Sequence, residues 1–267
     1  MPDPSQLLAR ARVLWPDLAV ELFDDGGVWV WRIDDFGVPD PELLQRDGEP
    51  DWERLRGRRE KYVRDVRDYW FHRYQPAEGD VIVDLGAGRG EDTYVFSQAV
   101  GAVGTVWAIE PHPASYAALE RLVRANLLGN VRTLRYACVE TPRALQIETM
   151  PVWESNYVRE GDATATSYPV EGITADALLA DVPRIDFLKM NIEGAERYAL
   201  PGCRELLRRA RFVCVAAHDF RADRGEGEEF RTLEFVREFL RDAGFELVTR
   251  DDDPRYYVPY HVHGTRR

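Results

Sequence analysis

Hydrophobic and polar residues follow two patterns along most of the chain, and each pattern predicts a type of element. Short apolar runs, many of them β-branched, predict strands, and segments whose apolar residues recur every three or four positions predict helices. From residue 81 onward the expected strands are Val81–Leu85, Thr105–Ile109, Val131–Val139, Ile185–Met190, Phe212–Ala217, Phe245–Arg250 and Tyr256–His263. The expected helices are Thr93–Val100, Pro113–Leu128, Ile173–Leu179, Glu196–Arg209 and Phe230–Ala243. This alternation predicts an α/β fold with a mostly parallel twisted sheet, whose two final strands form an antiparallel edge.

The N-terminal part has a different pattern, so we divide the chain into an extension, residues 1–76, and a main domain, residues 77–267. The extension is expected to contain a short helix at Ser5–Leu14 and a strand at Val28–Ile33. Breaks follow at Pro39, Pro41, Gly48 and Pro50. Beyond them, Asp51–Tyr74 has the spacing of a long amphipathic helix. The extension is therefore expected to be mainly helical and to cover part of the sheet.

Composition narrows the classes of function. The chain has 267 residues, a net charge of −12 and 45% hydrophobic residues, which suits a globular protein with a full core. The negative charge argues against a nucleic acid substrate, because phosphates require a basic face. No apolar run approaches the roughly 20 residues of a membrane helix, and the N-terminus does not resemble a signal peptide. Because the three cysteines form no C-x-x-C pair, we expect a cytoplasmic protein without disulfides; homo-oligomerisation stays open.

A glycine-spaced turn directly after the first predicted strand of the main domain is the strongest chemical signal. The strand carries Asp84, and the turn reads Gly86-Ala87-Gly88-Arg89-Gly90 before Asp92 and a helix start. Strand, glycine turn and helix N-terminus form the nucleotide half-site of a doubly wound sheet. The third glycine comes one residue too early for the dinucleotide fingerprint, which disfavours a nicotinamide-dependent oxidoreductase. An acid before the turn suits a cationic ligand such as S-adenosylmethionine better than a diphosphate.

A second acid lies at the end of the next predicted strand. Glu110, followed by Pro111, is placed where an acid can bind both ribose hydroxyls of a nucleoside. Cys138, near the end of the third strand, is expected to border the adenine. The two acids and the glycine turn together favour a nucleoside cofactor over a ligand-free loop.

The remaining strand ends supply the candidate catalytic groups, because ligands bind outside the carboxyl ends of the strands. Asn191 and Glu193 follow the fourth strand, and His218 and Asp219 follow the fifth. His218 is the first candidate for a general base, with Asp219 or Glu193 next, and Asn191 is expected to orient the acceptor. For each of these residues a purely structural role is the alternative.

Other clusters carry less weight. His261-x-His263 lacks a third spaced ligand, so no metal site is expected, and Asp251–Asp253 is interpreted as a turn. The basic residues at Arg54–Lys61 are interrupted by acids and are interpreted as a solvated helix face. No hydrolase or ATPase motif occurs.

These residues resemble the FkbM-type S-adenosylmethionine-dependent methyltransferases, from about Val81 to Phe220. The resemblance rests on Asp84–Gly90, on Ala108–Pro111 and on the run Ile185–Glu196. It implies a Rossmann-like class I methyltransferase fold and O-methylation, often of sugars or natural-product hydroxyls. One residue departs from the family, since Asn191 replaces the usual aspartate and cannot act as a base.

We therefore predict an S-adenosylmethionine-dependent O-methyltransferase acting on a small molecule. An N-methyltransferase, a nicotinamide-dependent oxidoreductase and a non-catalytic nucleoside-binding protein are the alternatives. The irregular stretch 141–170 and the N-terminal region are expected to determine the acceptor, and no readable motif there identifies it.

Overall fold

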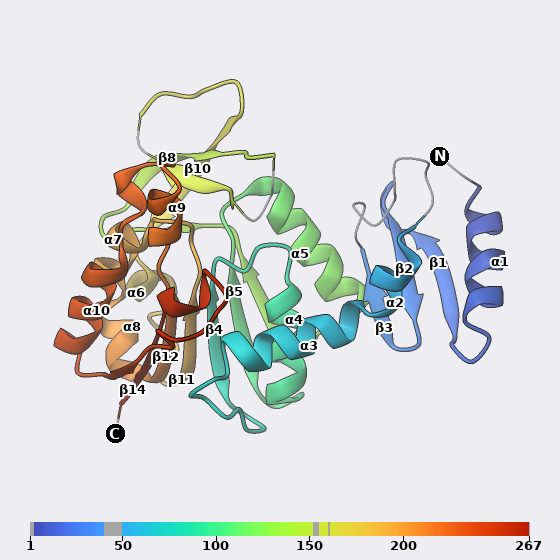
Figure 1. Ribbon diagram of the computed structural model, residues 1–267, viewed down its shortest axis with the longest axis horizontal. Coiled ribbons are helices and arrows are strands. Elements are labelled where there is room, and N and C mark those ends of the chain that lie inside the picture. The colour runs from blue at the N-terminus through green and yellow to red at the C-terminus, as the bar shows by residue number, and fades with distance from the viewer. Residues whose placement is uncertain (1–2, 40–49, 152–154, 160, 267) are drawn as a thin grey trace.

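The fold was analysed in a computed structural model, which describes residues 3–39, 50–151, 155–159 and 161–266. Its centre is a seven-stranded sheet in the order β13-β14-β12-β11-β4-β5-β6 (Figure 1). These strands are β4 (Val81–Leu85), β5 (Thr105–Ile109), β6 (Val131–Leu134), β11 (Ile185–Met190), β12 (Ala210–Ala216), β13 (Glu246–Val248) and β14 (His261–Thr265). The first five run parallel, and β14 pairs antiparallel with both β12 and β13. The predicted α/β class with an antiparallel edge is confirmed.

Helices cover both faces of this sheet. Their bounds are α4 (Glu91–Val100), α5 (Pro113–Ala125), α6 (Ala175–Leu178), α7 (Glu196–Ala199), α8 (Arg204–Arg209), α9 (Asp219–Asp223) and α10 (Leu233–Asp242). Helices α4 and α5 pack on one face, and α6, α7, α8 and α10 pack on the other. The predicted helix Glu196–Arg209 is divided, because a short 3-10 turn, Leu200–Cys203, with Pro201 near its start, lies between α7 and α8. No helix in the described part of the chain combines the length and apolarity that a bilayer crossing requires.

The N-terminal extension has more strand than its pattern predicts. It contains α1 (Pro4–Leu14), an antiparallel sheet β1-β2-β3, α2 (Trp52–Arg56) and α3 (Arg58–Tyr69). The strands are β1 (Val20–Asp24), β2 (Trp29–Ile33) and β3 (Phe36–Val38). The extension does contain three helices and the predicted strand β2, but β1 and β3 were not predicted, because such short strands gain stability only by pairing with β2. The expected long helix is divided at Gly57, and the predicted breaks at Pro41 and Gly48 lie outside the described residues.

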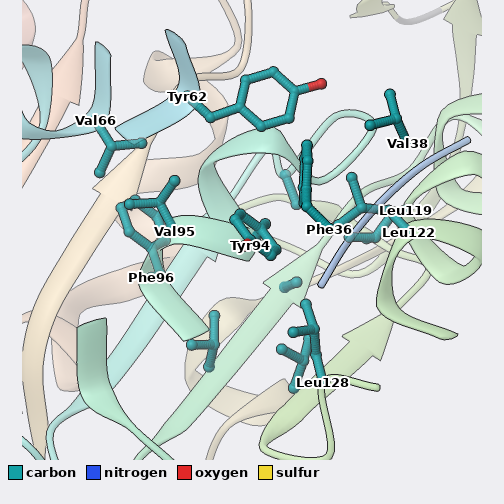
Figure 2. Packing of buried hydrophobic residues seen from close by; sticks show 14 of the residues in the cluster. Phe36, Val38, Tyr62, Val66, Tyr94, Val95, Phe96, Leu119, Leu122 and Leu128 are labelled. Atoms are coloured by element: carbon teal, nitrogen blue, oxygen red, sulfur yellow. The ribbon is translucent and has the colours of Figure 1, made fainter. Parts of the chain in front are cut away.

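The extension is joined to the main domain at α5. The side chain of Asn126, which ends α5, accepts a hydrogen bond from Gly37 N at 2.8 Å and donates one to Gly37 O at 2.9 Å. A Cβ at Gly37 would lie 2.9 Å from the Cβ of Ala125, so the close approach requires glycine. Phe36 continues this contact into the core beside Tyr62 and Tyr94 (Figure 2). Strand β3 and helix α3 thus pack against the same face as α4.

A second sheet covers the carboxyl edge of the main sheet. Its order is β7-β10-β8-β9, and its strands are β7 (Ala137–Cys138), β8 (Arg143–Glu148), β9 (Tyr157–Arg159) and β10 (Ser167–Ile173) (Figure 1). The expected strand Val131–Val139 therefore ends at Leu134 in the main sheet, and its last part pairs with β10 instead. The stretch that seemed irregular is a small antiparallel sheet. The predicted strand Tyr256–His263 also begins later, at His261, after a 3-10 turn.

Candidate active site

A cavity of about 650 Å³ lies at the carboxyl ends of β4, β5, β11 and β12. Helix α3 of the extension and strands of the second sheet contribute to its walls. The walls include all the predicted site residues except three: Asp84, Gly90 and Asp219. The location agrees with the rule that open α/β sheets bind ligands at this edge.

The glycine turn permits a close approach of two strand ends. Gly86 has a φ of +79°, and a Cβ there would lie 1.9 Å from the backbone oxygen of Asn191. No other residue fits this position without moving β4 or the segment after β11. Gly90 is required for helix packing instead, because a Cβ at this position would lie 2.8 Å from the Leu119 side chain of α5. Gly86 and Gly88 line the cavity, and Gly90 packs α4 against α5.

Glu110 lies at the cavity wall with both carboxylate oxygens in use. One oxygen accepts a hydrogen bond from Gly88 N at 2.9 Å, and the other accepts from His112 N at 2.9 Å. Burial raises the pKa of Glu110 to about 7 against the opposing effect of these two bonds. Since each oxygen has a further lone pair, Glu110 can still accept from two neighbouring hydroxyls.

Asp84 does not face the cavity, and sequence reasoning missed its partner. Lys189 Nζ donates to Asp84 Oδ1 at 2.8 Å and lies 3.5 Å from Asp92 Oδ2. Thr93 donates to the other oxygen of Asp84 at 2.6 Å. Asp84, predicted to lie near the ligand's ammonium, is fully buried beneath the turn, and Asp92 is the acid of this cluster that lines the cavity. A lysine within a buried central strand was the signal for the pair.

The three charged groups leave an excess of negative charge at Asp92. Two carboxylates share one ammonium group, so the cluster carries a net charge of −1 when all three are ionised. Burial raises the pKa of Asp92, and Lys189 acts in the opposite direction. Of the two acids, Asp92 lines the cavity. A cationic group bound there would be stabilised in a poorly solvated environment.

His218 lies between two carboxylates. Its Nε2 is 3.0 Å from Glu193 Oε1, and its Nδ1 is 3.0 Å from Glu196 Oε1. Burial alone would lower the pKa of His218, but the two carboxylates raise it to about 10. Both ring nitrogens donate when the ring is charged. His218 is therefore not placed to act as the general base, because its ring is protonated at neutral pH and each ring nitrogen already has a carboxylate partner.

The other catalytic candidates differ in position. Asp219 Oδ1 accepts from Thr232 N and Leu233 N, both at 2.8 Å, so it caps α10 and lies outside the cavity. Asn191 and Glu193 both line the cavity. Glu193 also accepts from Arg221 at 2.9 Å. Of the three ionisable candidates, Glu193 is thus the carboxylate that faces the site.

Aromatic side chains form part of the cavity wall. Tyr62, Tyr69 and Trp70 come from the α3 region, and Tyr257 comes from the segment before β14. The hydroxyls of Tyr69 and Tyr257 lie 2.6 Å apart, which joins the two walls. Tyr62 and Trp70 are buried, and both also line the cavity. The contact between Tyr69 and Tyr257 joins residues far apart in the chain, so no local sequence pattern could predict it.

The structure also places the histidine pair, Cys138 and the basic residues that the sequence analysis singled out. His261 and His263 are buried, and burial lowers their pKa values to about 4 and about 3. Within the described ranges, no group of three or more His, Cys, Asp or Glu side chains is arranged to hold a metal ion. Burial raises the pKa of the Cys138 thiol to about 12. Arg54 and the buried Arg58 line the cavity, so a purely solvated helix face was wrong for part of the basic cluster.

The chain is similar in sequence and in structure to known methyltransferases. Residues 84–247 match the methyltransferase FkbM domain. Hexuronic acid methyltransferase AglP from Haloferax volcanii is 28% identical over 144 residues, which are 53% of this chain and 57% of that protein. Methyltransferase FkbM from Methylobacillus flagellatus KT has a similar structure, with a TM-score of 0.52 at 16% identity, and the match covers 76% of this chain and 47% of that one. The chain thus spans roughly half the length of these relatives, and the structural likeness shows the fold alone.

Proposed function

Because the chain belongs to the FkbM methyltransferase family, we propose that it methylates a hydroxyl group of a small molecule such as a sugar or another natural product. The chain is a methyltransferase, and S-adenosylmethionine is its methyl donor. Membership of this methyltransferase family also argues against a nicotinamide-dependent oxidoreductase and against a non-catalytic nucleoside-binding protein. An amine acceptor is the competing proposal. The division into an extension, residues 1–76, and a methyltransferase domain, residues 77–267, belongs to the proposal and is supported by the match beginning at residue 84.

The observation that carries the proposal is that one cavity contains two sets of groups. Asp92, Glu110 and the glycine turn come from the segments after β4 and β5, and Glu193 and His218 come from the segments after β11 and β12. The first set suits an adenosyl cation, and the second suits a hydroxyl that must lose a proton.

Three features support cofactor binding by the first set. The net negative charge at Asp92 suits the ammonium of the methionine part. The outer lone pairs of Glu110 suit the two ribose hydroxyls. The side chain-free backbone at Gly86 and Gly88 lets a ligand approach closely, and Cys138 is proposed to border the adenine. When bound, the cofactor supplies a methyl group attached to a sulfonium, and the rest of the cofactor leaves as a neutral thioether.

Glu193 is the proposed proton acceptor. Its carboxylate faces the cavity, held by His218 at 3.0 Å and by Arg221 at 2.9 Å. As the acceptor oxygen gains the methyl group, its proton passes to Glu193, while the charged His218 holds that carboxylate in position. Asn191, beside the glycine turn, orients the acceptor by hydrogen bonding. Most of the acceleration would come from orientation in a site that excludes water.

Two observations support a small, ring-shaped acceptor. The aromatic wall of Tyr62, Tyr69 and Tyr257 offers flat apolar faces, which suit the apolar face of a sugar or aromatic ring. The net charge of −12 favours such a molecule over a nucleic acid. The name of the Haloferax volcanii relative, a hexuronic acid methyltransferase, is consistent with a sugar.

The test uses S-adenosylmethionine with an isotopically labelled methyl group and a small-molecule extract of the host. We expect label in a product of low molecular mass, as a methyl ether that resists mild alkali and acid. Heat-inactivated protein is the control. Label on nitrogen would favour the amine alternative, and label in protein or nucleic acid alone would refute a small-molecule acceptor.

A further inference from the structure

The contacts around His218 contain a carboxylate that does not reach the cavity. Glu196 is fully buried, and its Oε1 lies 3.0 Å from His218 Nδ1. Its Oε2 accepts a hydrogen bond from the Thr232 hydroxyl at 2.8 Å. A buried carboxylate is unfavourable unless charged and polar groups surround it. Gly194 N also donates to Oε1, at 3.3 Å, and the His218 partner leads to the active site.

His218 connects this buried carboxylate to the one that faces the cavity. Each ring nitrogen lies 3.0 Å from a different glutamate, and both contacts are favourable only if both nitrogens carry protons. With Glu196 absent, the ring would retain one carboxylate partner. The other titratable or charged groups nearby are Arg221 and Asp219 of α9 and the buried His261 of β14, which is neutral at pH 7 because burial lowers its pKa to about 4.

Glu193 needs this support because its backbone is unusual. Its φ is +55°, a left-handed conformation that only glycine adopts without strain. The next residue, Gly194, also has a positive φ of 95°, and a Cβ there would lie 2.6 Å from the Phe230 ring. Arg221 holds the second oxygen of Glu193 and packs on Phe230, with 3.9 Å from its guanidinium carbon to the ring centroid. His218 and Arg221 thus hold the Glu193 side chain from two directions.

We infer that Glu196 is a positioning residue for methyl transfer: acting through His218, which it keeps as a charged double donor, it holds the Glu193 carboxylate at the cavity wall. This inference deepens the proposed function and relies on its assignment of Glu193. Glu196 itself touches neither acceptor nor cofactor in this arrangement. It contributes the charge that makes the imidazole donate in both directions.

The first test needs no acceptor. The ring nitrogens of His218 are observed by NMR in protein labelled with 15N-histidine, and His218→Gln assigns the signal. In the unmodified protein we expect a doubly protonated ring up to its pKa of about 10. In Glu196→Gln, whose amide keeps the shape, the titration midpoint should fall by about 1–3 pH units. Thr232→Val is the matched control, since it removes the Thr232 hydrogen bonds to Glu196 and to His218 N and keeps the charge of Glu196. In this variant the His218 ring should stay charged at pH 7 as in the unmodified protein.

Two results would overturn the inference: a neutral ring at about pH 7 in the unmodified protein, or a midpoint that Glu196→Gln leaves unchanged. If Glu196→Gln does not fold, Glu193→Gln continues the test, because Glu196 alone must then keep the ring charged at that pH. A neutral ring there would refute the role of Glu196.

The second test measures transfer of label into the host extract. Glu196→Gln should lower the rate by about 100-fold while cofactor affinity, measured by calorimetry, stays the same. An equal loss in rate and in cofactor affinity would indicate a structural role and contradict the inference. If the unmodified protein labels nothing in the extract, the proposed function fails, and the NMR titration still decides the role of Glu196.

Discussion

Replacing Lys189 by methionine tests the buried charge cluster beneath the glycine turn. Methionine keeps most of the volume of lysine and removes the ammonium group. Asp84 would then be a fully buried carboxylate whose one remaining side-chain partner is Thr93. Removing one partner of a buried ion pair costs about 3–5 kcal/mol. That is a large part of the roughly 5–15 kcal/mol that stabilises a typical domain.

Urea denaturation monitored by tryptophan fluorescence measures this loss. With a slope of about 3 kcal/mol per M, the midpoint should fall by roughly 1–2 M. Lys61→Met is the matched control, since Lys61 forms an exposed pair with Asp65 at 2.5 Å, and such helix pairs contribute about 0.3–0.5 kcal/mol. Adding Asp84→Asn to Lys189→Met should recover part of the loss, because the buried charge is then removed. Equal midpoint changes for Lys189→Met and Lys61→Met would refute the reasoning.

Three further changes test the cofactor side and the docking of the extension. Glu110→Gln should weaken S-adenosylmethionine binding at least about tenfold in calorimetry. Because the raised pKa of Glu110 is about 7, affinity in the unmodified protein should rise as the pH increases through 7. An affinity that does not change with pH would argue against binding by the Glu110 carboxylate. Gly86→Ala should abolish binding or folding, since its Cβ would lie 1.9 Å from a backbone oxygen, whereas Gly129→Ala, with nothing within 4 Å, should have little effect on either. Asn126→Ala removes both hydrogen bonds to Gly37, so the free energy of unfolding should fall by about 1–3 kcal/mol. Limited proteolysis should then release the extension faster, and an unchanged cleavage rate would contradict this expectation.

Much of the main sheet could be predicted from sequence because its signals are local. The apolar runs at Val81–Leu85 and Ile185–Met190 match β4 and β11 residue for residue. Strand ends then indicated which acids gather at one edge, and Glu110 and Glu193 do line one cavity. A single chain with alternating strands and helices leaves few topologies, and the right-handed crossover rule selects among them.

The failures have a common physical origin in contacts between distant residues. The charge state of His218 depends on two glutamates more than twenty residues away, at separations of 22 and 25. Asp84 and Lys189 are 105 residues apart, so the neutralisation of that aspartate has no local signature. Short strands such as β3 form because a neighbour pairs with them, and pairing cannot be derived from a three-residue pattern.

The position of β14 between β12 and β13 has a consequence for synthesis on the ribosome. Strand β13 is made before β14, yet it joins the sheet only through β14. The nascent chain therefore cannot complete its sheet in the order of translation. Tyr257, which precedes β14, meets Tyr69 across 188 residues of sequence, so the aromatic wall closes at the same late moment. Until residues 261–265 have left the exit tunnel, β13 has no strand edge with which to pair, and the unpaired edge of β12 leaves the incomplete chain prone to aggregation.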